Sequence, residues 1–135
     1  AGAIVLSNRR ERLRTDRAFA RRSRASRTCR RRLKSARRLL REGEAGRFYA
    51  EAYRALSRYL GDKLDLPPGA VSAENAGEKL KAKGADPEVI REIEERFAEL
   101  DRARFTPLSG DPAGMEECLN GLEDLFCRLE KIKIK

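Results

Sequence analysis

Apolar residues recur at helical spacing along most of this 135-residue chain, and no segment alternates apolar and polar residues as a half-buried strand does. The clearest pattern lies in RFYAEAYRALSRYLGDKLDLPP. There the apolar positions follow one another four residues apart, at Phe48, Ala52, Leu56, Leu60 and Leu64. This spacing predicts an amphipathic helix with a wide apolar face, which the pair Pro67–Pro68 ends.

Upstream of that helix, residues 8–42 contain neither proline nor glycine, so nothing in the sequence interrupts one long helix. We expect Gly43 and Gly46 to close it, and residues 1–20 to be frayed. The apolar positions form a narrow stripe whose members are Ala18, Ala25, Cys29, Leu33, Ala36 and Leu40.

Three further helices carry recognisable start and stop signals. Ser72 is a predicted N-cap for a short helix with Ala76 and Leu80 on its apolar side, and Gly84 is its predicted stop. The dipeptides Asp86–Pro87 and Asp111–Pro112 place a capping side chain before proline at the first helical position. The apolar stripes that follow these two starts are Ile90, Ile93, Phe97 and Leu100 in one helix, and Met115, Cys118 or Leu119, Leu122, Leu125 or Phe126, and Leu129 in the other.

The sequence therefore predicts an all-α fold, a compact bundle of about five helices with a long Arg-rich first helix. The predicted core consists of Leu33, Leu40, Phe48, Leu56, Leu60, Ile90, Ile93, Phe97, Leu122, Leu125 and Leu129.

Charge divides the chain into a basic arm and a mildly acidic body. Residues 9–41 hold 16 Lys and Arg against two acids, a balance of +14, whereas the remainder carries −5. We assign residues 1–22 to a membrane-proximal basic segment and residues 23–135 to a helical cytoplasmic domain.

The opening AGAIVLSNRRERLR is typical of the cytoplasmic end of a membrane span, with apolar residues followed by arginines. A foreign leader before a native Arg run is the alternative. Because surface potential decays over about 8 Å at physiological salt, only the first arginines of a helix leaving the bilayer steeply would contact anionic lipid. These are Arg9, Arg10, Arg12, Arg14 and Arg17. The residues from Arg21 to Arg41 then need another counter-charge, in the acidic fourth helix or in a partner protein.

No catalytic constellation is evident. The chain contains no His, no phosphate-binding glycine loop and no nucleophile motif. Glu92, Glu95 and Glu99 share helical spacing, but we interpret them as an exposed face interleaved with Arg91 and Arg96. The three cysteines form no CxxC pair and are interpreted as buried small hydrophobes. We expect no enzymatic activity, no cofactor and no metal.

Two stretches resemble a known family. RRLKSARRLL…FYAEAYRALSRYLGDKLDLPPG and KLKAKGADPEVIREIEERFAELDRARFTP are similar to the C-terminal cytoplasmic domain of BatD-like proteins, the Bacteroides aerotolerance (oxygen-tolerance) family, over about residues 28–130. Thr106 and Leu100 depart from the residues common in that family. The resemblance implies a single-span protein of the bacterial inner membrane, with this domain on the cytoplasmic side. It further implies a scaffold role in oxidative or envelope stress tolerance, with MoxR-type AAA+ ATPases or von Willebrand factor A domain proteins as partners.

The alternative function is an Arg-rich helical nucleic-acid-binding domain, since such a helix neutralises phosphates. For a protein partner, we expect contact at tyrosines beside the apolar face of the second helix and at an Arg–Phe pair in the segment DRARFTP, interpreted as a loop after the fourth helix. These residues are Tyr49, Tyr53, Tyr59, Arg104 and Phe105. The alternative reading is that all five only seal the edge of the core.

Overall fold

The computed structural model describes residues 24–105 and 111–132. Five α-helices and one short 3₁₀ turn account for its regular structure, and these residues contain no strand. This confirms the predicted all-α bundle. The first helix covers residues 24–41 and is followed by α2 (Ala45–Leu64), η1 (Pro68–Ala70), α3 (Ala73–Ala82), α4 (Pro87–Phe105) and α5 (Pro112–Glu130). Residues 1–22, assigned to the membrane-proximal segment, lie outside the described residues.

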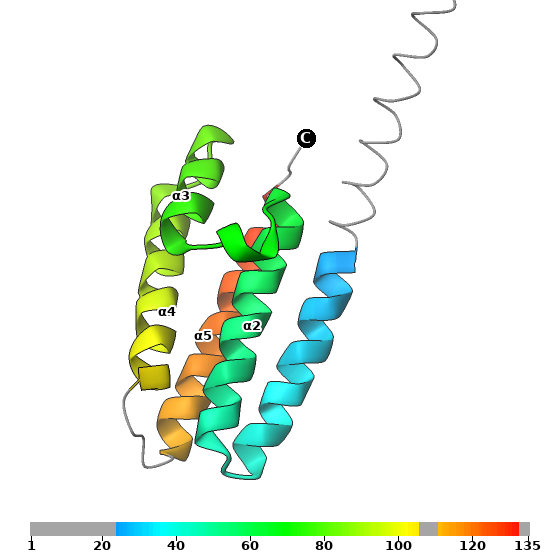
Figure 1. Cartoon of the computed structure of the whole chain (residues 1–135), viewed down its shortest axis with the longest axis vertical. Coiled ribbons are helices and arrows are strands. Elements are labelled where there is room, and N and C mark those ends of the chain that lie inside the picture. The colour runs from blue at the N-terminus through cyan, green and yellow to red at the C-terminus, as the bar shows by residue number, and fades with distance from the viewer. Residues whose placement is uncertain (1–23, 106–110, 133–135) are drawn as a thin grey trace, which may run out of the picture.

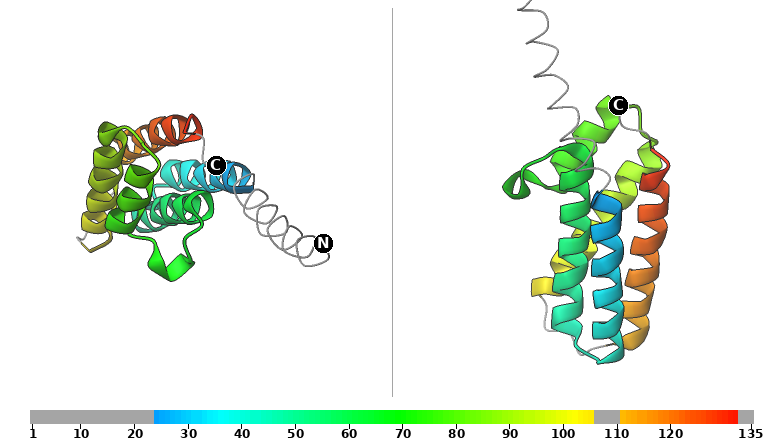
Figure 2. Two further views of the ribbon diagram at one scale, coloured as in Figure 1. Left: turned by 90° about the horizontal axis from the view of Figure 1, so that it is seen from above. Right: turned by 90° about the vertical axis from the view of Figure 1, so that its right-hand side faces the viewer.

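Four of the helices run side by side along the length of the molecule, and the shorter α3 packs at one end (Figure 1). The helix α4 contacts α2, α3 and α5, while α2 also contacts α3 and α5. The first helix lies over the seam between α2 and α5, as the right panel of Figure 2 shows. It therefore has one face on the bundle and a broad face turned outward.

A tight reversal joins the first helix to α2. The amide of Glu44 donates to the carbonyl of Leu39, and the amide of Gly43 donates to that of Leu40. These two bonds, with Gly43 at φ +72°, form a Schellman motif that favours glycine because the backbone is left-handed there. Gly46, expected to help close the first helix, instead lies in the first turn of α2.

The predicted helix starts are present as side-chain caps. The hydroxyl of Ser72 accepts a hydrogen bond from the amide of Asn75 at 3.1 Å. The carboxylate of Asp86 accepts from the amide of Glu88 at 3.0 Å, and that of Asp111 accepts from Ala113 at 3.2 Å. Each cap satisfies an amide that the helix leaves without a partner.

The core corresponds closely to the predicted stripes of α2 and α5. All five members of the i+4 series in α2 are buried, and so are the α5 residues from Met115 to Leu129 that face inward. The sequence left two choices undecided in α5, Cys118 or Leu119 and Leu125 or Phe126. All four of these residues are buried.

Three predicted core residues are only half-buried. Leu33 and Leu40 lie at the edge of the core, and Leu39 is buried in place of Leu40. In α4, Val89 is buried while Ile90 is half-buried. At Leu40 and Ile90 the buried position moves by one residue, because neighbouring residues on a helix differ by only about 100° and the packing of the bundle decides which one turns inward.

A glycine of α5 leaves room for an arginine side chain of α4. A Cβ built on Gly121 would lie 2.6 Å from the guanidinium carbon of Arg96. Arg96 thus extends along the surface of α5 and ion-pairs with Glu99 of its own helix at 2.8 Å.

Among the described residues, none of the helices is both long and apolar enough to cross a membrane.

Candidate functional site

The outward face of the first helix carries a straight row of cations. Nine of the residues from 24 to 41 are Lys or Arg, and none is acidic. Eight of the nine are exposed, and six of these follow each other at alternating steps of three and four residues. This basic stripe consists of Arg24, Arg27, Arg31, Lys34, Arg38 and Arg41. Such spacing keeps all six on one side of the helix, over a length of about 25 Å at about 1.5 Å per residue.

The opposite face of the first helix buries mainly small residues: Ala25, Cys29 and Ala36, with Leu39 at the end of the row. The stripe is therefore directed away from the bundle. Its C-terminal half borders a shallow hollow of about 510 Å³, lined by Arg31, Lys34, Ser35, Arg37, Arg38 and Arg41.

Two of the nine cations pair with the body of the bundle. Arg32 forms an ion pair with Glu51 of α2 at 3.2 Å, and Arg37 forms one with Glu123 of α5. Within the part of the chain that the structure describes, no ion pair joins a residue of the basic stripe to a carboxylate. Among the described residues, the carboxylates that pair with the first helix are thus on α2 and α5, not on the fourth helix as the sequence suggested.

Two carboxylates of α4 pair with arginines that lie outside the first helix. Glu92 is half-buried and pairs with Arg128 of α5 at 2.6 Å, and Glu99 pairs with Arg96. Of the three, only Glu95 is exposed, and Glu92 and Glu99 are half-buried. The interpretation of an exposed face is therefore correct for Glu95 but not for Glu92, which helps to join α4 to α5. The described residues contain no group of three His, Cys, Asp or Glu side chains that could hold a metal ion.

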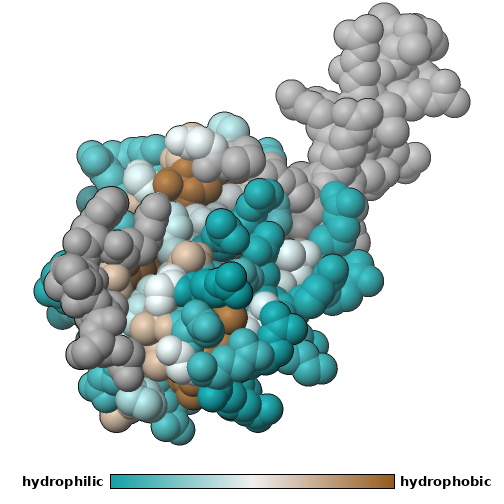
Figure 3. All heavy atoms as spheres, turned by 60° about the horizontal axis from the view of Figure 1, so that its bottom comes forward, coloured by the Kyte–Doolittle hydropathy of each residue, from teal (hydrophilic) through white to brown (hydrophobic). Residues whose placement is uncertain are grey.

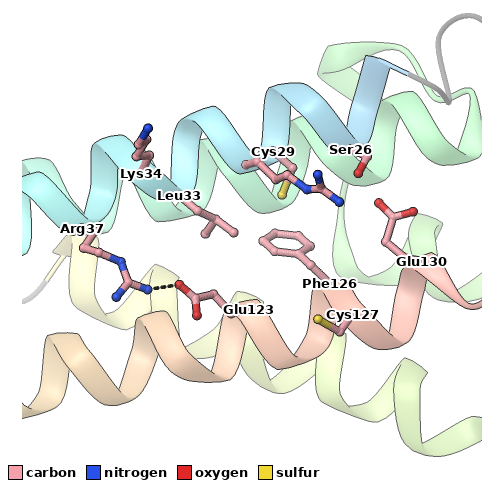
Figure 4. Close-up of a pocket in the computed structure, with 10 residues that line it drawn as sticks. Ser26, Cys29, Leu33, Lys34, Arg37, Glu123, Phe126, Cys127 and Glu130 are labelled. Carbon is pink, nitrogen blue, oxygen red and sulfur yellow. Dashed lines mark hydrogen bonds and ion pairs between the residues drawn. The ribbon is translucent and has the colours of Figure 1, made fainter.

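A groove of about 570 Å³ separates the first helix from α5 (Figure 4). The first helix contributes one wall: Ser26, Cys29, Arg30, Leu33, Lys34 and Arg37. The other wall comes from α5: Glu123, Phe126, Cys127 and Glu130. Leu33 and Phe126 face one another across the middle, and the Arg37–Glu123 ion pair crosses one end. The groove thus combines an apolar centre with a cationic wall and an acidic wall.

The cysteines differ in environment. Cys118 and Cys127 lie nine positions apart, on opposite sides of α5, and the first is buried while the second is exposed. The expectation of buried cysteines is correct for Cys29 and Cys118 and wrong for Cys127. Burial raises the pKa of the Cys29 thiol to about 12, and the nearby Glu130 carboxylate adds to this. Burial, followed by the charge of Glu99, raises the pKa of Cys118 to about 12.

Of the three tyrosines proposed for partner contact, Tyr59 is buried in the core. It is 2% exposed, and its ring lies 4.9 Å from that of Phe126. Burial, and then the charge of Glu130, raises its pKa. Its hydroxyl is enclosed and makes no hydrogen bond of good geometry within the described residues.

Tyr49 and Tyr53 are half-buried, and each makes an edge-to-face contact. Tyr49 packs on Phe48 at a ring separation of 5.1 Å, and Tyr53 packs on Phe97 at 5.8 Å. Burial also raises the pKa of Tyr49.

The segment interpreted as a loop is helical up to Phe105, so Arg104 and Phe105 belong to the last turn of α4. The structure does not bring the five residues into one described surface patch, because Tyr59 faces the core and the side chains of Arg104 and Phe105 lie outside the described part.

The predicted membrane contacts Arg9, Arg10, Arg12, Arg14 and Arg17 also lie outside the described residues. On the described part, Figure 3 shows hydrophilic side chains across much of one end of the bundle, with apolar residues visible between them in small patches. The basic stripe and the groove are the two surface features with a distinct chemical character. Sequence reasoning missed both, although the alternating three- and four-residue spacing of the cations was present to be found.

Comparison with known proteins identifies no relative: no family model, no curated protein and no solved structure matches the chain.

Proposed function

We propose that this chain is a non-enzymatic interaction domain that docks a protein partner through the outward face of its first helix. The basic stripe carries the proposal. Six exposed cations in a line have no carboxylate partner among the described residues, whereas Arg32 and Arg37 pair with carboxylates of the bundle. Like charges about 5 Å apart along a helix repel one another, so a complementary acidic surface would stabilise them.

The resemblance to BatD-like proteins supplies the partner class. The partner is a MoxR-type AAA+ ATPase or a von Willebrand factor A domain protein, and the setting is a scaffold on the cytoplasmic side of the bacterial inner membrane. Charge complementarity adds one requirement to this choice: the partner must present acidic residues to the stripe, which would also speed association.

Binding of the full chain to purified candidates of both partner classes, measured by calorimetry, tests the proposal. The triple variant Arg31→Glu, Arg38→Glu and Arg41→Glu reverses half of the stripe and is expected to weaken binding about tenfold or more, because like charges then face each other. The matched control is Arg47→Glu, Arg54→Glu and Arg58→Glu, which changes three exposed arginines of α2. Equal loss in both variants, or no binding by the unmodified chain, contradicts the proposal.

Tyr49, Tyr53, Arg104 and Phe105 stay part of the proposal as partner contacts, whereas Tyr59 leaves it because its side chain is buried in the core. Tyr53→Ala and Arg104→Ala are each expected to abolish capture of the partner while the domain stays folded. Tyr53 also packs on Phe97, so the melting temperature is measured in parallel. Tyr53→Phe retains the ring and is the control for packing. A folded Tyr53→Ala chain that still captures the partner removes this surface from the proposal.

Nucleic-acid binding remains the second candidate, because the hollow beside the stripe is lined almost wholly by cations. Phosphate binding would show a steep loss of affinity with salt. Gel shifts with random duplex DNA and single-stranded RNA near physiological salt separate the two candidates. Tight binding that disappears in the stripe variant and persists in the α2 control would favour the nucleic acid.

Contact of the N-terminal arginines with the membrane is a second, independent part of the proposal. Anionic vesicles are expected to recruit the full chain, and added salt is expected to reduce binding, since each basic residue near the surface contributes about 1 kcal/mol. Replacing Arg9, Arg10, Arg12, Arg14 and Arg17 with Gln should abolish recruitment. Equal affinity for neutral and anionic vesicles contradicts the membrane contact and leaves the protein-docking function in place.

A further inference from the structure

We infer that the groove between the first helix and α5 binds an amphipathic helix of the protein partner, with an apolar face in the groove and an acidic flank over the first helix. The inference rests on the proposed protein-docking function and specifies the segment that docks. The basic stripe alone would form only exposed ion pairs, each worth about 0–1 kcal/mol. A docking site needs apolar contact as well.

The groove has the length and direction that a helix requires. Arg37 pairs with Glu123 at one end, whereas Ser26 and Glu130 lie at the other. The residue numbers therefore rise along one wall as they fall along the other, so the two helices are antiparallel. The first helix covers about 16 Å from Ser26 to Arg37, at about 1.5 Å per residue, which is about three turns. A helix laid between two others in this way repeats the packing of the bundle itself.

The centre of the groove is apolar, and Leu33 is only partly covered there. Leu33 is half-buried although it was predicted to lie in the core, and it packs at the core's edge. Phe126 lies opposite and is 5% exposed. Apolar residues spaced three and four apart on an incoming helix would cover Leu33 and remove it from water.

Charge decides which helix fits. Arg30 and Lys34 on the first-helix wall have no ion pair among the described residues, and Lys34 also belongs to the basic stripe. Acidic residues on one flank of the partner helix would lie over these two cations. Further acids on the same flank would lie over the rest of the basic stripe, because residues on one side of the partner helix and of the first helix both recur every three or four positions. The α5 wall carries Glu123 and Glu130, so the other flank is neutral or basic.

The same two carboxylates disfavour other occupants. A nucleic-acid strand in the groove would bring its phosphates against Glu123 and Glu130. An anionic lipid headgroup would meet the same repulsion. Phe126 is too enclosed to offer a face for base stacking. A protein helix is the occupant whose two flanks can differ in charge.

The experiment selects binders from a phage-displayed library of 18-residue helical peptides, with the full chain as bait. Enriched peptides are expected to share apolar residues at three- and four-residue steps and acids on one flank. Synthetic copies are then tested for binding to variants. Leu33→Glu should weaken binding about tenfold or more, and so should the exposed pair Arg30→Glu and Lys34→Glu, which leaves the apolar centre intact.

Two controls match these variants. Ile90→Glu changes a half-buried apolar residue in a different groove, between α3 and α4, and Arg54→Glu with Arg58→Glu changes two exposed arginines of α2. Both should leave affinity unchanged. If no helical peptide is enriched, or if Leu33→Glu and the Arg30–Lys34 pair bind as the unmodified chain does, the inference is overturned. If Leu33→Glu does not fold, the charge-reversed pair decides alone.

These experiments distinguish a failure of the groove as a binding site from a failure of the proposed docking function. A MoxR-type or von Willebrand-type partner that binds and is insensitive to Leu33→Glu overturns the groove and leaves the docking function in place. Peptides that bind the groove while neither partner class binds the chain overturn the partner assignment. Peptides that bind only as a result of dimerisation of the chain, seen by sedimentation, overturn the groove as a partner site.

Discussion

The first helix and α2 are neighbours joined by a tight turn, yet they contact the bundle in opposite ways. The first helix buries Ala25, Cys29 and Ala36, whereas α2 buries Phe48, Leu56 and Tyr59 among others. Burial of a large apolar side chain is worth about 1.5–3 kcal/mol, and that of alanine far less. The first helix is therefore held weakly for its length, and α2 is the centre of the fold.

The difference extends to their outer faces. The first helix carries nine cations and no acid over residues 24–41, and only Arg32 and Arg37 pair with described carboxylates. The charged residues of α2 are of both signs. A helix with small inward residues and unpaired outward cations contributes little to stability and much to the surface that a partner meets. Measurements that separate the two helices can break or sharpen this contrast.

The largest effect is expected in α2. Leu56 is fully buried, and Leu56→Ala should lower the free energy of unfolding by about 2–5 kcal/mol through lost burial and a residual cavity. Leu60→Ala should behave alike, since Leu60 is equally buried. Leu33→Ala in the first helix, where the leucine is half-buried, should cost less than half as much. Denaturant unfolding followed by circular dichroism measures all three, and equal losses at the two helices would contradict the contrast.

Alkaline pH should destabilise the domain through Cys29 and Cys118. Both thiols have a pKa near 9.0 in the unfolded chain and about 12 when folded. The unfolded chain therefore releases the proton first, and the stabilisation present below about pH 9 is lost as the pH rises toward 12. Linkage gives each thiol a slope of at most about 1.4 kcal/mol per pH unit. The double variant Cys29→Ala and Cys118→Ala should show a shallower decline between these pH values, and an unchanged decline would refute the assignment.

Enlarging the small interface of the first helix should also destabilise the domain. Ala36 is fully buried, so Ala36→Leu forces the helix away from the bundle and should cost about 1–3 kcal/mol. Arg38→Leu places the same side chain on the exposed face of the same helix and serves as the control. If Ala36→Leu is as stable as the unmodified protein, the first helix packs less closely than its small residues indicate.

Thiol labelling should reveal which region opens first. Cys127 is exposed and should react at once at neutral pH, while Cys29 and Cys118 are buried and protonated. If the first helix detaches with α2 and α5 still folded, Cys29 should be labelled about tenfold faster than Cys118, which corresponds to about 1.4 kcal/mol in the cost of opening. Mass spectrometry resolves the three sites. Equal rates for Cys29 and Cys118 would mean that the domain opens only as a unit.

The smallest effect is expected at the surface ion pair between the first helix and α5. Arg37 and Glu123 are both substantially exposed, so Arg37→Ala should change the free energy of unfolding by less than about 1 kcal/mol. Arg32→Ala should cost more, because Arg32 and Glu51 are less exposed. A double-mutant cycle at each pair isolates the interaction. A larger coupling at Arg37–Glu123 would show that charge, not apolar contact, holds the first helix in place.

Local signals in the sequence were sufficient for the helices and their ends. Ser72, Asp86 and Asp111 cap the helices they precede, because a cap depends on a side chain and an amide two or three residues away. The wide stripe of α2 was equally predictable, since an unbroken i+4 series leaves one choice of buried face. The narrow stripe of the first helix left two choices, and the prediction selected Leu40 where the bundle buries Leu39.

What the sequence alone determined is therefore the all-α class, the caps, the buried face of α2 and the concentration of cations on the first helix. Only the tertiary structure decided that Arg32 and Arg37 meet Glu51 and Glu123, that Tyr59 is buried beside Phe126, and that Leu33 borders a groove. The physical reason is the range of each interaction. Caps and helical periodicity act over a few residues of one chain segment, whereas an ion pair such as Arg37–Glu123 depends on how residues 86 positions apart are brought together.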